Sequence, residues 1–280
     1  MTARFGARLA EAVAARGPLC AGIDPHPGLL EAWGLPVDVS GLERFALTAA
    51  EALGEVAAIV KPQSAFFEAF GSAGVAVLER VIDVAHDAGS LVLLDVKRGD
   101  IGSTMAAYTA AYVAEKAAFT ADAATVSPYL GFGALDDAVA AAREAGNGLF
   151  VLARTSNPEA SALQRARLED GRTVAQSVVD AAAAHNAGEE PYGDVGVVVG
   201  ATVAPGEVDL SQLNGPVLAP GFGAQGATEA DLRAVFGDAL PGLLPASSRD
   251  LLRHGPDPDA LRRAAQGVNG RLAGPGAKGQ

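Results

Sequence analysis

Residues 91–104 place charged side chains directly after a run of apolar ones. Positions 91–94 are apolar, and Asp95, Lys97 and Asp100 then follow within six residues. In a β-strand, side chains at positions i and i+2 lie on the same face, so Asp95 and Lys97 point the same way. A carboxylate and an amine on one face form a pair that can hold and deliver a proton.

Two more charged residues end apolar runs that come earlier in the chain. Asp24 ends the first run and Lys61 ends the second. A lysine placed among carboxylates keeps its proton, because opposite charges favour the charged form. Such a lysine acts as a general acid or a fixed cation, not as a Schiff-base nucleophile, which needs a lowered pKa. The set suits a reaction that removes negative charge from one position and delivers a proton there. The alternative is a group of surface ion pairs at strand ends.

A glycine-rich segment at 220–228 indicates a phosphate site. Its glycines match G-x-G-x-x-G, but a dinucleotide site is disfavoured because the segment comes late and no acid ends the next strand. Glycines between a strand and a helix can bind phosphate through backbone N–H groups. In α/β barrels, the loops after strands seven and eight often hold phosphate. Gln225 and Arg249 would add side-chain donors. The alternative is that the glycines only form turns and Arg249 is a solvated charge.

Other polar groups give weaker signals. The loop at 152–158, which includes Ser156, offers hydroxyl and amide groups for a polar ligand, as a plain loop also would. The four histidines lack metal-ligand spacing, so the sequence predicts no metal site. No Ser-His-Asp or Cys-His arrangement is indicated.

These residues need a scaffold that brings strand ends together. Short apolar runs near 19–24, 57–61, 91–97, 123–127, 149–153, 195–199, 216–219 and 242–246 predict strands. Helical patterns lie near 2–16, 41–53, 72–88, 103–119, 133–145, 170–186, 201–209, 226–236 and 257–268. Such alternation is typical of βαβ units and a parallel sheet. Eight units predict a single-domain (β/α)8 TIM barrel over residues 1–269 with a flexible tail at 270–280, and a doubly wound sheet is the second choice. The charged strand ends then lie at the C-terminal mouth, where barrel active sites are found.

The composition disfavours several classes of partner. The 280 residues carry 21 Lys and Arg against 33 Asp and Glu, a net charge of −12, which is not the electrostatic footprint of a nucleic-acid-binding protein. The single cysteine, Cys20, cannot form an internal disulfide and fits a reducing compartment. The first residues lack the apolar core of a signal peptide, and no uncharged apolar run reaches the ~18 residues of a membrane span. We therefore expect a cytoplasmic protein without nucleic-acid or membrane partners.

The segment 95–104 resembles the D-x-K-x-x-D-I-x-x-T motif of the orotidine 5′-phosphate decarboxylase family. It contains Asp95-Val96-Lys97-Arg98-Gly99-Asp100-Ile101-Gly102-Ser103-Thr104. The R-G-D-I-G-S-T part and the Ala-Arg-Thr-Ser-Asn-Pro loop are similar to the type 2 bacterial branch, and the resemblance runs from Gly22 to Arg249. It implies a barrel homodimer with shared active sites that converts orotidine 5′-monophosphate to UMP and CO2, the last step of de novo pyrimidine nucleotide synthesis, without metal or organic cofactor.

The resemblance also implies roles for individual residues. Lys97 would protonate C6 as CO2 leaves, and Asp95 would sit against the departing carboxylate. The implied catalytic residues are Lys97, Asp95, Asp100 and Lys61. The implied substrate-binding residues are Asp24, Thr104, Ile101, Ser156, Pro220, Gln225 and Arg249.

Within these sets the implied contacts differ. Asp100 and Thr104 would reach the site of the neighbouring subunit. The ribose hydroxyls would bind Asp24 and Lys61, and the pyrimidine ring would contact Ser156. The phosphate would bind Gln225 and Arg249, with Ser247 or Ser248 as further candidates.

Three other functions stay open at this stage. The first is a Mg-dependent sugar-phosphate decarboxylase or aldolase of the same superfamily, which shares the Asp-x-Lys-x-x-Asp core. The second is a Schiff-base aldolase that uses Lys61 or Lys97. The third is a barrel that only binds phosphorylated ligands. The Lys-Arg-Gly-Asp-Ile-Gly-Ser-Thr run favours the nucleotide decarboxylase.

Overall fold

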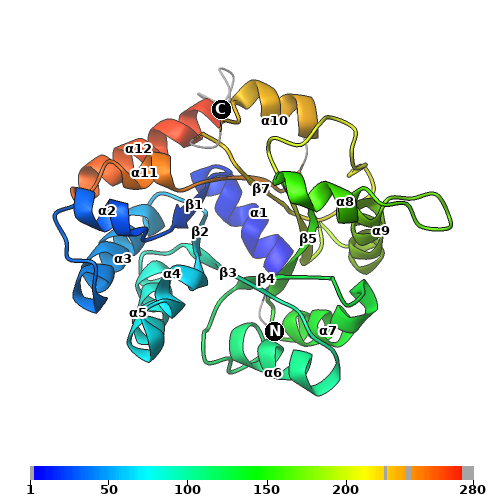
Figure 1. The fold of residues 1–280 in the computed structure, drawn as a ribbon, viewed down its shortest axis with the longest axis horizontal. Helices are drawn as coiled ribbons and strands as arrows, with labels where there is room; N and C mark the ends of the chain where they lie inside the picture. The colour runs from blue at the N-terminus through cyan, green and yellow to red at the C-terminus, as the bar shows by residue number, and fades with distance from the viewer. Residues whose placement is uncertain (1–2, 224–225, 238–240, 273–280) are drawn as a thin grey trace.

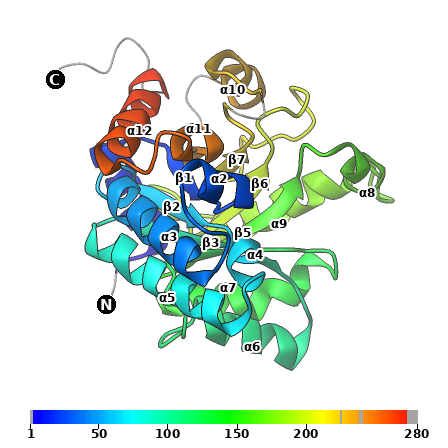
Figure 2. The ribbon, with the colours of Figure 1, turned by 60° about the vertical axis from the view of Figure 1, so that its left-hand side comes forward.

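The computed structural model describes residues 3–223, 226–237 and 241–272. Eight parallel strands close into a barrel in sequence order, and β8 returns to pair with β1. Figures 1 and 2 show the helices around this barrel. The predicted single-domain (β/α)8 barrel is therefore confirmed.

Every strand overlaps a predicted apolar run. The strands are β1 (Cys20–Ile23), β2 (Ile59–Pro62), β3 (Leu91–Arg98), β4 (Ala123–Val126), β5 (Gly148–Arg154), β6 (Val195–Val199), β7 (Val217–Pro220) and β8 (Leu243–Ser247). Most of their residues are buried consecutively, because helices cover the outside of the barrel and side chains fill its inside.

The helices mostly follow the predicted alternation. They are α1 (Phe5–Arg16), α2 (Pro27–Ala32), α3 (Val39–Gly54), α4 (Ser64–Glu68), α5 (Gly71–Asp87), α6 (Gly102–Tyr112), α7 (Asp136–Glu144), α8 (Ser161–Gln164), α9 (Val174–Asn186), α10 (Glu229–Phe236), α11 (Arg249–Leu252) and α12 (Pro258–Leu272). Short 3-10 turns lie at η1 (Phe132–Leu135) and η2 (Pro158–Ala160).

Two helix predictions need correction or extension. The helix predicted near 201–209 is wrong, because these residues form turns and bends between β6 and β7. Pro205 lacks a backbone donor and Gly206 has a φ of 79°, neither of which suits a helix interior. At the other end of the chain, α12 continues to Leu272, into the range predicted as a tail. Residues 273–280 of that predicted tail lie outside the described residues.

Helix α1 closes the N-terminal end of the barrel, opposite the mouth. Figure 1 shows it lying across the middle of the strands. Its Phe5 and Leu9 are fully buried and join a cluster of inward-facing strand residues. The rings of Phe5 and Phe150 meet edge to face with centroids 6.0 Å apart. In the described ranges, no helix is long and apolar enough to cross a membrane.

Candidate active site

Asp95, near the C-terminal end of β3, is the centre of a buried charged cluster. The Nζ of Lys61 donates to its Oδ2 at 3.0 Å, and the Nζ of Lys97 donates to its Oδ1 at 2.5 Å. Oδ1 of Asp24, which follows β1, lies 3.9 Å from the Nζ of Lys61. Asp95 and Lys61 are each 6% exposed. Three adjacent strand ends thus bring together four of the residues proposed from sequence.

The charges in this cluster stabilise one another. Burial disfavours the charge of Asp95, but the positive charges of Lys61 and Lys97 outweigh burial and hold its pKa below the usual range. Burial also disfavours the charge of Lys61, yet the carboxylates of Asp95 and Asp24 raise its pKa above the usual value. Both groups are therefore ionised at neutral pH, and Lys61 lacks the lowered pKa that a Schiff-base nucleophile requires.

The cysteine beside this cluster is not a nucleophile. Cys20 is fully buried at the start of β1, and burial raises the pKa of its thiol to about 12. Because the thiolate is the reactive form, a thiol with this pKa stays inert near neutral pH.

Lys97 reaches the cluster through an irregularity in β3. Leu94 pairs with Ala124 and Arg98 pairs with Val126, so β3 has extra residues between these two pairs. Lys97 itself has a φ of 46°. That left-handed conformation costs a residue with a side chain about 1–2 kcal/mol. Backbone strain of this kind is often found at functional sites.

Two further residues bind Asp95 and were missed by sequence reasoning. Gln63 donates from Nε2 to Oδ2 at 2.9 Å, and Thr125 donates from its hydroxyl to Oδ1 at 2.8 Å. Gln63 stands two positions after Lys61, so the spacing of side chains along β2 could have revealed it. Thr125 lies inside a buried apolar strand, and nothing in its local sequence marks it.

The cluster forms one wall of a cavity of about 540 Å³ at the C-terminal mouth. The proposed site residues that line it are Asp24, Lys61, Asp95, Lys97, Ser156, Pro220 and Arg249, together with Ser247 and Ser248. His26, Gln63 and Phe222 also line it and were not predicted. The Oδ1 of Asp24 and the Oγ of Ser248 are buried with no hydrogen-bond partner among the described residues. Buried polar atoms normally have partners, so these two oxygens are suited to a polar ligand.

Contacts of Arg154, Thr155 and Ser156 hold the loop after β5 in place. Arg154 is 6% exposed, and its Nε lies 2.5 Å from Oε2 of Glu207. The Oε1 of Gln164 accepts from the backbone N–H of Thr155 at 2.8 Å. Ser156 packs so tightly on Gly200 that a Cβ at Gly200 would lie 3.0 Å from it. These contacts hold Ser156 at the edge of the cavity.

Three proposed residues do not line the cavity of this chain. Asp100 is half-buried at the turn after β3, and one of its carboxylate oxygens accepts from the N–H of Ile101 at 2.8 Å. Ile101 is 60% exposed, and Thr104 on α6 is also exposed. Gln225 lies outside the described residues. Among the described residues, no group of three or more His, Cys, Asp or Glu is arranged to hold a metal ion.

Residues 17–264 match the family described as "Orotidine 5'-phosphate decarboxylase / HUMPS family". The chain belongs to this family. Two curated members named orotidine 5′-phosphate decarboxylase come from Salinispora arenicola and Streptomyces coelicolor. They are 64% and 59% identical to this chain, over 94% and 93% of it and 95% and 94% of their own lengths.

Solved structures of the family agree in fold. A crystal structure described as an orotidine 5′-phosphate decarboxylase from Streptomyces avermitilis is 57% identical. It has a TM-score of 0.94 and covers 97% of this chain and 95% of its own. A Toxoplasma gondii structure described as an orotidine-monophosphate decarboxylase is 29% identical, with a TM-score of 0.78 and 96% of each chain covered. The family architecture thus extends over nearly the whole chain.

Proposed function

We propose that this chain decarboxylates orotidine 5′-monophosphate to UMP and CO2 in the cytoplasm, as the last step of de novo pyrimidine nucleotide synthesis. The observation that carries the proposal is the ion pair of Lys97 with the buried Asp95 at the mouth of the barrel, in a chain that is 64% identical to a named orotidine 5′-phosphate decarboxylase. The pair combines a carboxylate that stays ionised with an ammonium held beside it.

The proposed chemistry follows from the charges around Asp95. The carboxylate of the substrate would lie against Asp95, whose lowered pKa keeps it negative. Repulsion between these two carboxylates favours departure of CO2, which leaves its bonding electron pair on C6. The Nζ of Lys97 then gives its proton to C6. Before that transfer, its positive charge stabilises the developing carbanion, and the hydrogen bond to Asp95 orients it in advance.

The rest of the substrate would bind along the same cavity. We assign the ribose hydroxyls to Asp24 and Lys61, because the buried Oδ1 of Asp24 has no partner among the described residues. Ser156 and Pro220 border the space for the pyrimidine ring.

Arg249 would bind the phosphate, with the buried hydroxyl of Ser248 beside it and Ser247 and Gln225 as further candidates. Binding energy from phosphate, which is remote from C6, can be used to order the reacting groups.

One assay tests this function against its main alternative. Loss of the absorbance of orotidine 5′-monophosphate is followed with purified protein, with and without EDTA. We expect turnover that EDTA does not change. Loss of turnover in EDTA that added Mg²⁺ restores would instead indicate Mg-dependent chemistry, as in the sugar-phosphate enzymes of the superfamily. No turnover under either condition would contradict the proposal.

The homodimer and its shared sites are also part of the proposal. Asp100, Ile101 and Thr104 lie outside the cavity of their own chain, and the side chain of Ile101, within the motif, is exposed. We propose that these residues complete the site of the neighbouring subunit in a two-fold dimer.

Mixing two inactive variants tests this arrangement. Lys97→Ala and Asp100→Ala homodimers are each expected to be nearly inactive. In a mixed dimer, one site carries both defects and the other carries neither. Equal co-refolding makes half of the dimers mixed, so about a quarter of wild-type activity per total site should return. If exchange of subunits is demonstrated and no activity returns, Asp100 acts within its own chain.

A further inference from the structure

Thr125 is the one residue of β4 that faces the irregular part of β3. Leu94 and Arg98 pair with Ala124 and Val126, so Asp95, Val96 and Lys97 have Thr125 alone opposite them. Regular pairing would supply one partner residue for each. Thr125 is 1% exposed, which places its hydroxyl inside the protein beside the interrupted ladder.

The hydroxyl of Thr125 takes over the role of the missing ladder bonds. It accepts from the backbone N–H of Val96 at 3.0 Å and from that of Lys97 at 2.9 Å. It donates its own proton to Oδ1 of Asp95 at 2.8 Å. A hydroxyl has one proton to donate and two lone pairs to accept with, so all of its capacity is used.

These three bonds join the two groups that would carry the reaction. The same Oδ1 of Asp95 that accepts from Thr125 also accepts from the Nζ of Lys97. The backbone N–H of Lys97 is held at the residue that has the left-handed φ. Thr125 is not among the residues that line the cavity, so its influence on a bound molecule must pass through Asp95 and Lys97.

We propose that Thr125 is a positioning residue that aligns Asp95 and Lys97 for proton delivery. This inference rests on the proposed function. The requirement is chemical as well as steric, because the position needs a group that accepts two N–H bonds and donates one. Serine meets this requirement, whereas valine has the same shape and cannot. Small displacements of reacting groups can cost a factor of about 100 in rate, and we expect the loss of these bonds to have an effect of that kind.

The test compares Thr125→Val with Thr125→Ser. For Thr125→Val we expect kcat to fall about 10- to 100-fold. KM and the calorimetric dissociation constant of UMP should stay within about threefold of wild type, since ribose and phosphate contacts are untouched. Thr125→Ser should keep kcat within about threefold, because it restores all three bonds. A merely structural role would not separate kcat from UMP affinity in this way.

Thr109→Val is the matched control. Thr109 is also a buried threonine, but its hydroxyl donates to the backbone carbonyl of Met105 within α6. This variant removes a buried hydroxyl away from the cavity, so kcat should stay near the wild-type value. Thermal melts of all variants show whether each is folded at the assay temperature. Should Thr125→Val not fold, Thr125→Cys takes its place, because a thiol fits the space and forms only weak hydrogen bonds.

The outcomes separate this inference from the function on which it rests. Wild-type protein that fails to turn over orotidine 5′-monophosphate would contradict the proposed function. An active wild type with an equally active, folded Thr125→Val variant would overturn the role of Thr125 alone. Equal losses of kcat and of UMP affinity would also overturn it, because they would indicate general damage to the site.

Discussion

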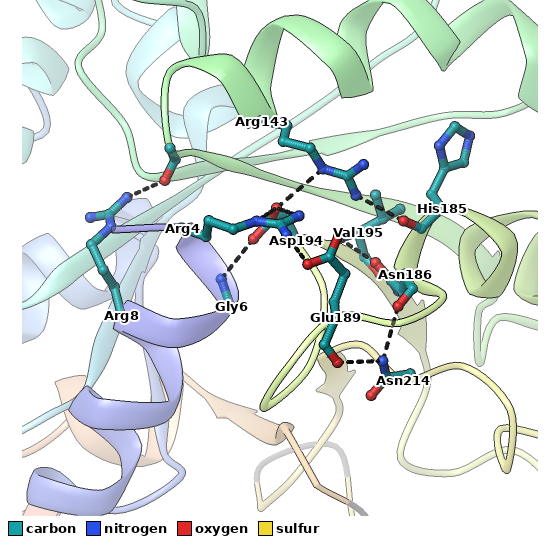
Figure 3. A network of polar contacts seen from close by, with 11 residues as sticks. Arg4, Gly6, Arg8, Arg143, His185, Asn186, Glu189, Asp194, Val195 and Asn214 are labelled. Atoms are coloured by element: carbon teal, nitrogen blue, oxygen red, sulfur yellow. Dashed lines mark hydrogen bonds and ion pairs between the residues drawn. The ribbon is translucent and has the colours of Figure 1, made fainter. Parts of the chain in front are cut away.

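Buried aspartates lie at both ends of the barrel, and they have different partners. At the mouth, Asp95 accepts from the ammonium groups of Lys61 and Lys97. At the opposite end, Asp194 just before β6 accepts from Arg4, the N-cap of α1, at 2.8 Å and from Arg143 of α7 at 3.4 Å. Figure 3 shows both arginines directed at Asp194. One carboxylate is held by groups that can release a proton and the other by groups that cannot.

At the N-terminal end of the barrel, backbone N–H groups also donate to the buried carboxylates, whereas the bonds described to Asp95 all come from side chains. The N–H of Gly6 donates to Asp194 at 3.0 Å (Figure 3). In a second such set, Asp122 accepts from the N–H of Val92 at 2.8 Å, from His86 and from Arg8 of α1. These bonds tie α1 to strands that lie more than a hundred residues further along the chain. The comparison teaches that a buried aspartate beside lysines is suited to the proposed proton transfer, whereas a buried aspartate beside arginines and backbone N–H groups stabilises the fold.

The largest effect should come from removing the proton donor at the mouth. For Lys97→Ala we expect kcat to fall by at least about 10²–10⁴-fold, the usual contribution of a positioned general acid. The melting temperature should change little, because the lysine side chain is 46% exposed and Lys61 still pairs with the buried Asp95. Steady-state kinetics and a thermal melt are the two measurements. Turnover within tenfold of wild type would remove Lys97 from its proposed role.

Asp194→Asn, at the N-terminal end of the barrel, should lower stability and leave activity unchanged. It removes the charge that Arg4 and Arg143 share, and hydrogen bonds to charged groups contribute about 1.5–3 kcal/mol. Because the two arginine side chains are 39% and 33% exposed, water can solvate them and limit the loss. We expect the melting temperature to fall by about 5–10 °C. Below that temperature, kcat and KM should remain those of wild type.

A surface pair supplies the control for this variant. Glu43 and Arg80 form an exposed ion pair, with side chains 37% and 53% exposed. Exposed pairs of this kind contribute about 0–1 kcal/mol. Glu43→Gln should therefore shift the melting temperature by much less than Asp194→Asn does. Equal shifts in melting temperature would mean that the bonds of Asp194 to Arg4 and Arg143 contribute no more to stability than a surface ion pair does.

A smaller effect on the free energy of unfolding is expected when acid titrates the buried carboxylates at both ends of the barrel. Burial opposes the charge of Asp122, but the hydrogen bond from His86 and the charge of Arg8 hold its pKa below the usual 3.8. The pKa of Asp95 is also lowered. Since both groups bind protons more readily when unfolded, their stabilisation is complete above about pH 5 and is lost as pH falls through the folded pKa values.

Urea unfolding between pH 7 and pH 3 measures this dependence. The free energy of unfolding should be nearly constant down to about pH 5 and should then decline. The decline should be shallower in Asp122→Asn, which has one titrating carboxylate fewer. If the free energy of unfolding declines with pH equally steeply in wild type and in Asp122→Asn, Asp122 does not contribute to the pH dependence of stability.

Local sequence predicted much of the fold and part of the site. The eight strands are apolar runs, and alternation along each run fixes the face of its last charged side chains, so Asp24, Lys61, Asp95 and Lys97 could be placed together in advance. The helix expected near 201–209 failed because a short apolar pattern does not outweigh Pro205 and Gly206.

The sequence by itself determined the order of strands and helices and the charged strand ends, since both depend on spacing within a few residues. Only the tertiary structure decided which groups meet across the barrel. The register between β3 and β4 sets Thr125 opposite Lys97, and the seating of α1 sets Arg4 against Asp194. Such pairings join residues far apart in sequence. They depend on how the closed sheet aligns its strands, which no short stretch of sequence contains.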